Sequence, residues 1–213
     1  MGGCLNGGGL LKTKRVGVLV SGRGTNLQAL LDAARAGRLG GDIAVVLSNV
    51  ETAPALERAR AAGVKALFRD HRGRAREVFD QELLSLLREH AADLVCLAGF
   101  MRRLSPVVLR AFPGGVVNVH PSLLPAFPGL EAQRQAFEYG VKVSGATVHL
   151  LDEDLDHGPI VLQEAVPVLD GDSPESLSAR ILEAEHRIYP RAVRLLLEGR
   201  YRLEGRRVIT EAA

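Results

Sequence analysis

Residues 16–37 read VGVLVSGRGTNLQALLDAARAG, and this stretch contains an apolar run, a glycine-rich turn and a helical pattern in direct succession. The run VGVLV is typical of a buried strand, whereas NLQALLDAARAG has the three- and four-residue apolar spacing of a helix. The same order returns as IAVVLS before APALERARAAG, VKALF before AREVFDQELLSLLREH, and DLVCLAG before SPVVLRAF, after which VVNVH closes the series. Strands that alternate with helices indicate a mainly parallel sheet with helices on both faces.

The second half of the chain has a different pattern. VSGATVHLL (143–151) and IVLQEAVPV (160–168) are separated only by a short loop, so they predict antiparallel neighbours. A long helical pattern then begins at Ser173, the expected N-cap, with Pro174 at the first helical position. We therefore expect an α/β, Rossmann-like fold whose mixed sheet is parallel in its N-terminal half and antiparallel in its C-terminal strands.

Composition agrees with a soluble enzyme, and we expect the protein in the cytoplasm. With 46% hydrophobic residues among 213, it can bury one substantial core, so we expect a single domain over residues 15–213. Residues 1–14, MGGCLNGGGLLKTK, lack the apolar core of a secretory signal and are expected to form a flexible leader. No run reaches the roughly 18 apolar residues that span a bilayer. A net charge of +2 does not suggest a nucleic-acid binder.

The two cysteines carry no metal or disulfide pattern. Cys4 and Cys96 are too few and too far apart for a metal knuckle or a disulfide framework. Cys96 lies inside the apolar run LVCLAG, which predicts a buried free thiol. Neither cysteine is therefore expected to act as a nucleophile, and a reducing compartment fits.

The stretch VVNVHPSLLPAFPG (116–129) places an amide, Asn118, and an imidazole, His120, two residues apart at the end of an apolar run. In an extended backbone both side chains project from the same face. An amide donor beside a group that titrates near neutrality suits acyl transfer, in which an oxyanion develops. The prolines that follow predict a rigid wall just past the strand end. For this spacing alone, a packed structural histidine is the alternative.

The turn SGRGTN (21–26) follows a strand and opens a helix, where backbone N–H groups and the helix dipole bind phosphate. It is not a dinucleotide fingerprint, because Leu27 stands where the third glycine would be, and no Lys-Ser/Thr pair follows as in a P-loop. A small monophosphate suits the turn better than a pyrophosphate. A glycine-rich turn that serves backbone geometry alone is the alternative.

The simplest interpretation of the acidic loop LDEDLD (151–156) is a solvated hairpin turn. An aspartate of this loop and His120 are possible zinc ligands, but no H-x-x-x-H or C-x-x-C string supplies the remaining ligands, so we expect no metal. The other histidines are expected at the surface or in structural roles: His71, His90, His149, His157 and His186.

The string NVHPSLLPAFPG resembles the formyltransferases that use a 10-formyl folate donor, which share an Asn-x-His element followed by SLLP. Three further stretches narrow the resemblance to the phosphoribosylglycinamide formyltransferase branch of purine biosynthesis. They are VLVSGRGTNLQALLDA (18–33), LAGFMRRLSP (97–106) and LDEDLDHGPIVLQEAVPVLDGDSPESLSARILEAEHRIYP (151–190). Together the resemblances cover residues 15–203.

The resemblance implies transfer of the formyl group of 10-formyltetrahydrofolate, a co-substrate, to the amine of glycinamide ribonucleotide. It implies a phosphate-binding half, residues 15–115, and a catalytic and folate-binding half, residues 116–213. The chain would act as a monomer or homodimer without nucleic acid or membrane. The implied residues are Asn118, His120 and Asp156 for catalysis; Gly24, Thr25, Asn26 and Glu185 for the ribonucleotide; and Arg76, Met101, Arg102, Arg103, Leu104, Asn118 and Asp152 for folate. The carboxylate of Asp156 would favour the charged imidazolium of His120.

Three positions depart from the family's usual pattern. Arg23 replaces a smaller polar residue and makes the phosphate approach more basic, Arg103 replaces an apolar residue, and His157 replaces a glycine after the catalytic aspartate.

Three other functions are compatible with parts of the chain. A methionyl-tRNA formyltransferase shares the Asn-x-His and SLLP elements but carries a C-terminal tRNA-binding domain, for which the tail 204–213 leaves no room. The formyl-folate hydrolases usually add an N-terminal regulatory domain. A non-enzymatic phosphate sensor would use the SGRGTN turn alone.

Overall fold

The structure is a computed structural model that describes residues 13–210, so the predicted leader at 1–14 lies almost entirely outside the described residues. The strands are β1 (Arg15–Val20), β2 (Asp42–Ser48), β3 (Ala66–Phe68), β4 (Leu94–Leu97), β5 (Val116–His120), β6 (Val143–Leu150), β7 (Ile160–Pro167), β8 (Tyr201–Glu204) and β9 (Arg207–Thr210). The helices are α1 (Thr25–Arg35), α2 (Pro54–Ala61), α3 (Arg76–Glu89), α4 (Pro106–Ala111), α5 (Ala132–Tyr139) and α6 (Pro174–Glu198).

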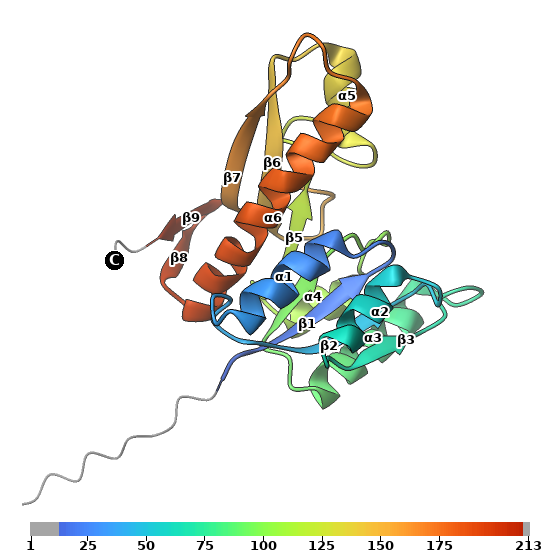
Figure 1. The fold of residues 1–213 in the computed structure, drawn as a ribbon. Helices are drawn as coiled ribbons and strands as arrows, with labels where there is room; N and C mark the ends of the chain where they lie inside the picture. The colour runs from blue at the N-terminus through green and yellow to red at the C-terminus, as the bar shows by residue number, and fades with distance from the viewer. Residues whose placement is uncertain (1–12, 211–213) are drawn as a thin grey trace, which may run out of the picture.

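All nine described strands form one mixed sheet in the order β3-β2-β1-β4-β5-β6-β7-β9-β8 (Figure 1). The pairs from β3 to β5 are parallel, while β5 with β6 and β6 with β7 are antiparallel. This arrangement confirms the expected α/β fold with a parallel first half and antiparallel late strands. The expected pairing of residues 143–151 with 160–168 is also confirmed, since β6 and β7 run through these stretches.

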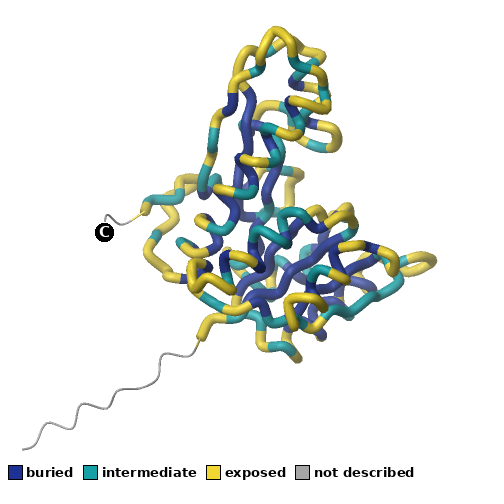
Figure 2. Tube along the Cα trace, in the orientation of Figure 1, coloured by how far each residue is buried: buried dark blue, intermediate teal, exposed yellow. Residues whose placement is uncertain are grey.

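Two apolar cores lie on opposite faces of the sheet. Val16 and Val18 of β1 point to the first core, which α1, α2 and α6 cover, whereas Leu19 points to the second core, beneath α3 and α4. The alternation of side chains along the strand explains how one apolar run serves both cores. In Figure 2 the buried residues accordingly run along the central strands. None of the helices within residues 13–210 has the length and apolar character needed to cross a membrane.

The long C-terminal helix begins as expected. Ser173 is the N-cap of α6, its hydroxyl accepts from the amide N–H of Ser176 at 3.3 Å, and Pro174 is the first helical residue. The helix continues through Pro190, a residue without an amide hydrogen, and ends before Gly199. Its length lets it pack against α1 as well as against β6 and β7.

Two features were not predicted from the sequence. The α5 helix follows the proline-rich stretch, and β8 and β9 form a hairpin around Gly205, whose φ of 60° is left-handed. The predicted short tail from residue 204 is thus partly a strand. A single parallel pair, Ile160 with Arg207, joins this hairpin to the sheet. The alternation of apolar residues in RLEGRRVIT is interrupted by charges, so the strand signal is weak.

The order of the strands creates a site at the carboxyl edge of the sheet. The chain moves outward from β1 to β2 and β3, then returns to the other side of β1 to form β4 and β5. At such a switch point the loops after β1 and β4 diverge, and ligands bind in the resulting crevice. Residues 21–26 follow β1, residues 98–105 follow β4, and His120 ends β5.

Candidate active site

Asn118 and His120 lie at the end of β5 and share one face of the sheet. Their neighbours Val117 and Val119 belong to the core under α1 and α6, so the two polar side chains point to the opposite face. His120 is buried, and Asn118 is half-buried. The expectation of a shared face at a strand end therefore agrees with the geometry.

His120 lies between two acceptors. Its Nε2 is 2.9 Å from the carbonyl oxygen of Phe127, and its Nδ1 is 3.4 Å from Oδ2 of Asp156. A carbonyl oxygen only accepts, so Nε2 carries a hydrogen in this arrangement and Nδ1 faces the carboxylate. The 3.4 Å separation is longer than a well-formed hydrogen bond.

The position of Asp156 is set by an unusual backbone. Its φ of 50° lies in the left-handed region, which aspartate adopts more readily than most residues. The amide N–H of Gly129 donates to Oδ2 of Asp156 at 2.8 Å. The carboxylate is thus held from the stretch that follows the prolines and is directed at His120, while its side chain is only 11% exposed.

His149 completes this group, although sequence reasoning placed it among surface or structural histidines. It lies opposite Asn118 in the pairing of β5 with β6 and is buried. Its Nδ1 is 3.0 Å from the carbonyl oxygen of Leu150, while Nε2 is 3.3 Å from Nδ2 of Asn118 and 3.8 Å from Oδ1 of Asp156. The ring therefore donates from Nδ1 and accepts the Asn118 amide hydrogen at Nε2. Burial lowers the pKa of His149 and so supports this neutral form.

A polar network positions the loop that contacts His120. The Thr147 hydroxyl donates to the carbonyl of Ser122 at 2.7 Å and accepts from the amide N–H of Leu124 at 3.0 Å. Gln163 donates to the Leu124 carbonyl and to the Thr147 hydroxyl, both at 2.9 Å. No local sequence signal singles out Thr147 or Gln163, because their contacts join β6 and β7 to residues more than 15 positions away.

The turn after β1 presents the N-terminus of α1. Gly24 is the N-cap, with φ 72°, and makes no side-chain cap. A Cβ atom at this position would lie 2.6 Å from the Cβ of Ala55, so only glycine fits. No acidic residue lies in the first turn of α1, so its N–H groups and dipole suit an anion. Thr25 and Asn26, both predicted to bind the ribonucleotide, lie in this turn.

Asn26 connects the turn to α6. Its Nδ2 donates to Oε2 of Glu185 at 2.5 Å, although the two residues are 159 positions apart. Oδ1 of Asn26 is buried and has no hydrogen-bond partner among residues 13–210. Glu185 is also buried, and burial raises its pKa to about 7. The structure therefore brings together the residues predicted to bind a ribonucleotide.

Ser21 was not predicted, yet it joins the phosphate turn to the predicted folate segment. Its amide N–H donates to the carbonyl of Gly99 at 3.0 Å, and its hydroxyl accepts from the amide N–H of Met101 at 2.9 Å. The same hydroxyl donates to Oδ1 of Asn49 at 2.6 Å. The loops after β1 and β4 are thus linked at the switch point.

Most of the predicted folate residues lie in two segments that touch. Nη2 of Arg103 donates to the carbonyl of Glu153 at 3.1 Å, which joins residues 101–104 to the acidic loop. Met101 is exposed, Leu104 is buried, and the Arg102 guanidinium lies 5.2 Å from the centroid of the Phe79 ring.

Besides Asn118, described above, the predicted folate set includes Asp152 and Arg76. Asp152 contacts Nδ1 of His157 at 2.8 Å, and that ring also accepts from Arg206 in the unpredicted hairpin. Arg76 pairs with Glu77 at 3.3 Å at the start of α3. Within the described residues, no hydrogen bond or ion pair joins Arg76 to the other predicted folate residues.

The remaining candidate metal ligands and nucleophiles do not form a second reactive centre within the described residues. Within residues 13–210, no group of three or more His, Cys, Asp or Glu side chains is arranged to hold a metal ion. Cys96 is a buried free thiol, and burial raises its pKa to about 12, so it is a poor nucleophile. Cys4 lies outside the described residues.

Comparison with known proteins agrees with this geometry. The family profile described as formyl transferase matches residues 14–193. The chain is 43% identical to the phosphoribosylglycinamide formyltransferase of Escherichia coli strain K12, over 87% of this chain and 88% of that protein. It is 49% identical to the trifunctional purine biosynthetic protein adenosine-3 of Drosophila melanogaster over 88% of this chain, but it spans only 14% of that protein's length.

A solved structure has the same fold. The crystal structure of glycinamide ribonucleotide transformylase 1 from Symbiobacterium toebii superimposes with a TM-score of 0.92 at 56% identity. The match covers 96% of this chain and 99% of that one.

Proposed function

The chain belongs to the formyl transferase family, and from that membership we propose that it transfers the formyl group of 10-formyltetrahydrofolate to the amine of glycinamide ribonucleotide. The products are formylglycinamide ribonucleotide and tetrahydrofolate, in a step of de novo purine biosynthesis. One observation carries the proposal: Asn118, His120 and Asp156 meet at the carboxyl edge that also holds the α1 N-terminus and the predicted folate segments.

The acceptor binds at the first turn of α1. Its phosphate accepts from the backbone N–H groups at Gly24, Thr25 and Asn26, where the dipole favours negative charge. Its ribose hydroxyls bind Asn26 and Glu185. The buried Oδ1 of Asn26 supports this assignment, because a hydroxyl donor there would satisfy an acceptor that has no partner among the described residues.

The formyl donor binds between residues 101–104 and the acidic loop. The Arg103 bond to Glu153 holds these two segments together and supports a shared pocket for the pterin ring. Backbone groups of Arg102 and Leu104 and the region of Asp152 line this pocket. Arg76, at the exposed start of α3, serves as a contact for the carboxylate tail of the folate.

The chemistry is a direct acyl transfer. The neutral acceptor amine attacks the formyl carbon, which forms a carbon–nitrogen bond and turns the formyl oxygen into an oxyanion. Asn118 donates a hydrogen bond to this oxygen. His120 donates to it from Nδ1, whose 3.4 Å contact with Asp156 is too long for a well-formed hydrogen bond, and the Asp156 carboxylate beside the ring stabilises it as a donor. The bond from the formyl carbon to the folate nitrogen then breaks, while the proton lost by the attacking amine passes to that nitrogen. No covalent enzyme intermediate and no metal take part.

Two effects account for the rate enhancement in this mechanism. A preorganised oxyanion donor is worth roughly 3–4 kcal/mol, and His149 preorganises one by accepting a hydrogen of the Asn118 amide. Holding two substrates in attack geometry contributes up to roughly 7–11 kcal/mol. The bond from Ser21 to Met101 supports the second effect, because it fixes the acceptor turn relative to the donor segment.

Hydrolysis of the formyl folate is the second candidate, with water in place of the amine. The same three catalytic residues would serve it. The paired Asn26 and Glu185 favour transfer, because a hydrolase has no need of a buried polar site for an acceptor sugar.

The same proposal includes the limits of the two halves of the domain and the cellular compartment. Residues 15–115 supply the phosphate turn, and residues 116–213 supply the catalytic group and the acidic loop. The buried free thiol of Cys96 supports a reducing compartment such as the cytoplasm. The protein works as a monomer or homodimer without nucleic acid or membrane.

The deciding experiment follows tetrahydrofolate release from 10-formyltetrahydrofolate with and without glycinamide ribonucleotide, and identifies the product by mass. Release that requires the ribonucleotide and yields its formylated form supports the transferase. Release of the same rate without the acceptor supports the hydrolase instead. Binding of 10-formyltetrahydrofolate and glycinamide ribonucleotide without release of tetrahydrofolate would support a sensor function instead.

A further inference from the structure

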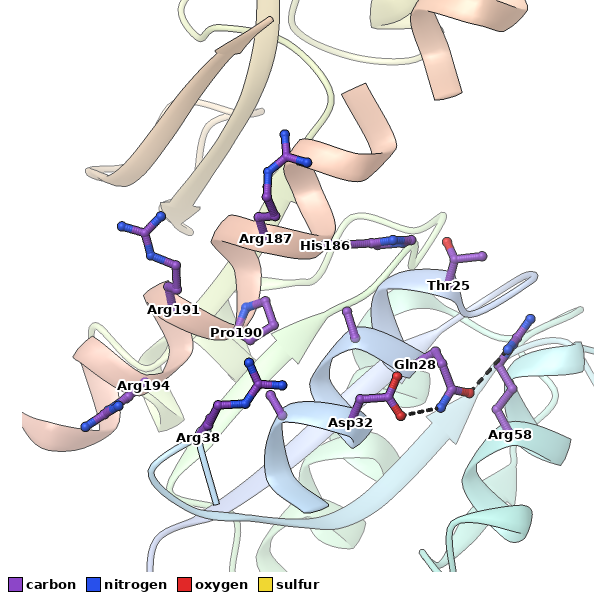
Figure 3. A pocket seen from close by; sticks show the side chains of 12 residues that line it. Thr25, Gln28, Asp32, Arg38, Arg58, His186, Arg187, Pro190, Arg191 and Arg194 are labelled. Atoms are coloured by element: carbon purple, nitrogen blue, oxygen red, sulfur yellow. Dashed lines mark hydrogen bonds between the residues drawn. The ribbon is translucent and has the colours of Figure 1, made fainter. Parts of the chain in front are cut away.

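A groove lies between α1 and α6, apart from the catalytic group. It encloses about 780 Å³, and none of Asn118, His120 and Asp156 lines it. Thr25 and His186 both contribute to its lining, as Figure 3 shows. The lining residues are Thr25, Gln28, Ala29, Asp32, Ala33, Arg38, Arg58, His186, Arg187, Pro190, Arg191 and Arg194.

The lining is strongly basic. It contains five arginines, and Asp32 is its only carboxylate. Arg187 is paired with Glu164 at 2.5 Å, and Arg194 is paired with Glu198 at 2.6 Å. The side chains of the exposed Arg38 and Arg191 make no hydrogen bond or ion pair with any residue of the described part of the chain. The groove therefore keeps a positive charge that the surrounding carboxylates do not balance.

The shape of the groove follows from small residues and a proline. Ala29 and Ala33 of α1 and Pro190 of α6 contribute apolar surface to the lining. Because Pro190 has no amide hydrogen, the carbonyl of His186, four residues earlier, lacks its ordinary helical donor. The lining thus combines apolar surface with the arginines.

Two hydrogen bonds fix the side chain of Arg58 at the end of the groove beside Thr25. Its Nε donates to the carbonyl of Arg23 at 2.9 Å, and its Nη1 donates to Oε1 of Gln28 at 3.2 Å. Figure 3 shows the Gln28 amide between Arg58 and Asp32, and Gln28 donates to Asp32 at 2.9 Å. This chain of bonds fixes one guanidinium and shields it from the carboxylate of Asp32.

We propose that this groove binds a small molecule that carries two or more phosphate groups, such as a nucleoside triphosphate. The arginines of α6 occupy positions 187, 191 and 194, so they extend over about 10 Å of helix, more than a single phosphate contacts. Guanidinium groups bind phosphate oxygens through paired N–H donors. Thr25 lines the end of the groove next to the turn proposed for the acceptor phosphate, whereas Arg38 follows the C-terminal end of α1 at the other end of the groove, so this inference does not depend on formyl transfer.

Calorimetric titration with inorganic triphosphate tests the proposal at a fixed ionic strength near 0.15 M. The groove variant is Arg38→Gln/Arg191→Gln. The control variant is Arg110→Gln/Arg202→Gln, which loses the same charge at exposed positions on α4 and β8. We expect one triphosphate per chain, binding at least about tenfold weaker in the groove variant, or about 1.4 kcal/mol, and unchanged binding in the control.

Competition separates the groove from the acceptor site. Triphosphate should bind with the same affinity when glycinamide ribonucleotide is saturating, and orthophosphate should bind more weakly than triphosphate. The proposal is overturned by absence of saturable binding, by equal weakening in both variants, or by displacement with the ribonucleotide. Tight binding of a single-stranded oligonucleotide without binding of triphosphate would overturn it as well.

Discussion

The side-chain amide of Asn26 donates to Oε2 of Glu185 at 2.5 Å, which joins the first turn of α1 to the middle of α6. The carboxyl group is buried, and burial outweighs this hydrogen bond, so the pKa of Glu185 rises to about 7. A group proposed to bind ribose hydroxyls therefore also makes the stability of the protein depend on pH.

Glu185→Gln should remove that dependence. The folded protein keeps the Glu185 proton up to about pH 7, whereas the unfolded chain loses it near 4.5, so the folded state binds more protons between these values. The free energy of unfolding of the wild type thus falls as pH rises through this window. Relative to the wild type, Glu185→Gln should gain on the order of 3 kcal/mol between pH 4.5 and 8.

Urea unfolding at pH 5 and pH 8 measures this difference. Glu183→Gln is the matched control, because Glu183 is an exposed carboxylate on the same helix. If Glu185→Gln and Glu183→Gln respond alike to pH, the Glu185 carboxylate is not the source of the effect.

His120→Ala should lower kcat by roughly 100- to 1000-fold, because it removes an oxyanion donor. The affinity for glycinamide ribonucleotide should stay within about threefold, since the proposed acceptor residues Gly24–Asn26 and Glu185 are untouched. Initial rates give kcat, and calorimetry gives the affinity. His90→Ala, at the end of α3, is the control and should keep full activity. Undiminished turnover in His120→Ala would remove this ring from the mechanism.

His149→Gln tests the neutral histidine beside Asn118. Burial lowers the His149 pKa, so below its ordinary value of 6.5 the unfolded chain takes up a proton that the folded protein resists. The His149 contribution to stability should therefore fall as pH falls below 6.5, opposite in sign to the Glu185 contribution, and His149→Gln should gain stability relative to the wild type as pH falls through this range. The pH dependence should not vanish in the variant, because burial lowers the pKa of His186 in the same direction.

Thermal unfolding between pH 5 and 7.5 provides the comparison, with His90→Gln as the control. The glutamine oxygen can still accept the Asn118 amide hydrogen, so kcat should fall less than in His149→Leu, which cannot accept. Identical pH slopes in the wild type and His149→Gln would contradict the assignment.

Thr147→Val should weaken the loop that contacts His120. The change keeps the volume of the side chain but leaves Ser122, Leu124 and Gln163 without their shared hydroxyl partner. Unsatisfied buried groups cost roughly 1–3 kcal/mol, so the free energy of unfolding should fall by about that amount. Because this loop supplies the Phe127 carbonyl to the His120 ring, kcat should fall as well.

Urea unfolding and initial rates measure the two effects of Thr147→Val. Thr52→Val, at an exposed threonine after β2, should change neither. Lower stability with unchanged kcat would show that the network stabilises the fold without positioning His120.

Short-range sequence patterns predicted much of this protein's secondary structure and strand pairing. The apolar runs and helical spacings predicted the alternation from β1 to α4, and the short connection between β6 and β7 predicted their antiparallel pairing. The two-residue spacing of Asn118 and His120 predicted their shared face, because side chains alternate along a strand. Weak or interrupted patterns, as in α5 and the hairpin of β8 and β9, were missed.

Contacts between distant segments could be located only in the folded chain. His149 reads as one histidine among several in the sequence, yet the register of β5 with β6 places it against Asn118. The bonds from Ser21 to Met101 and from Gln163 to Leu124 likewise join residues that no local pattern relates.

The sequence by itself determined the strands and helices that have strong periodic patterns and which segments carry reactive groups, because these properties depend on neighbours within a few positions. Tertiary structure alone decided how Asp156 meets His120, how Glu185 becomes buried beside Asn26, and how the arginines of α6 come to line a groove with Arg38 and Arg58. Those arrangements depend on strand order, register and helix packing, which are set by burial of apolar surface across the whole chain.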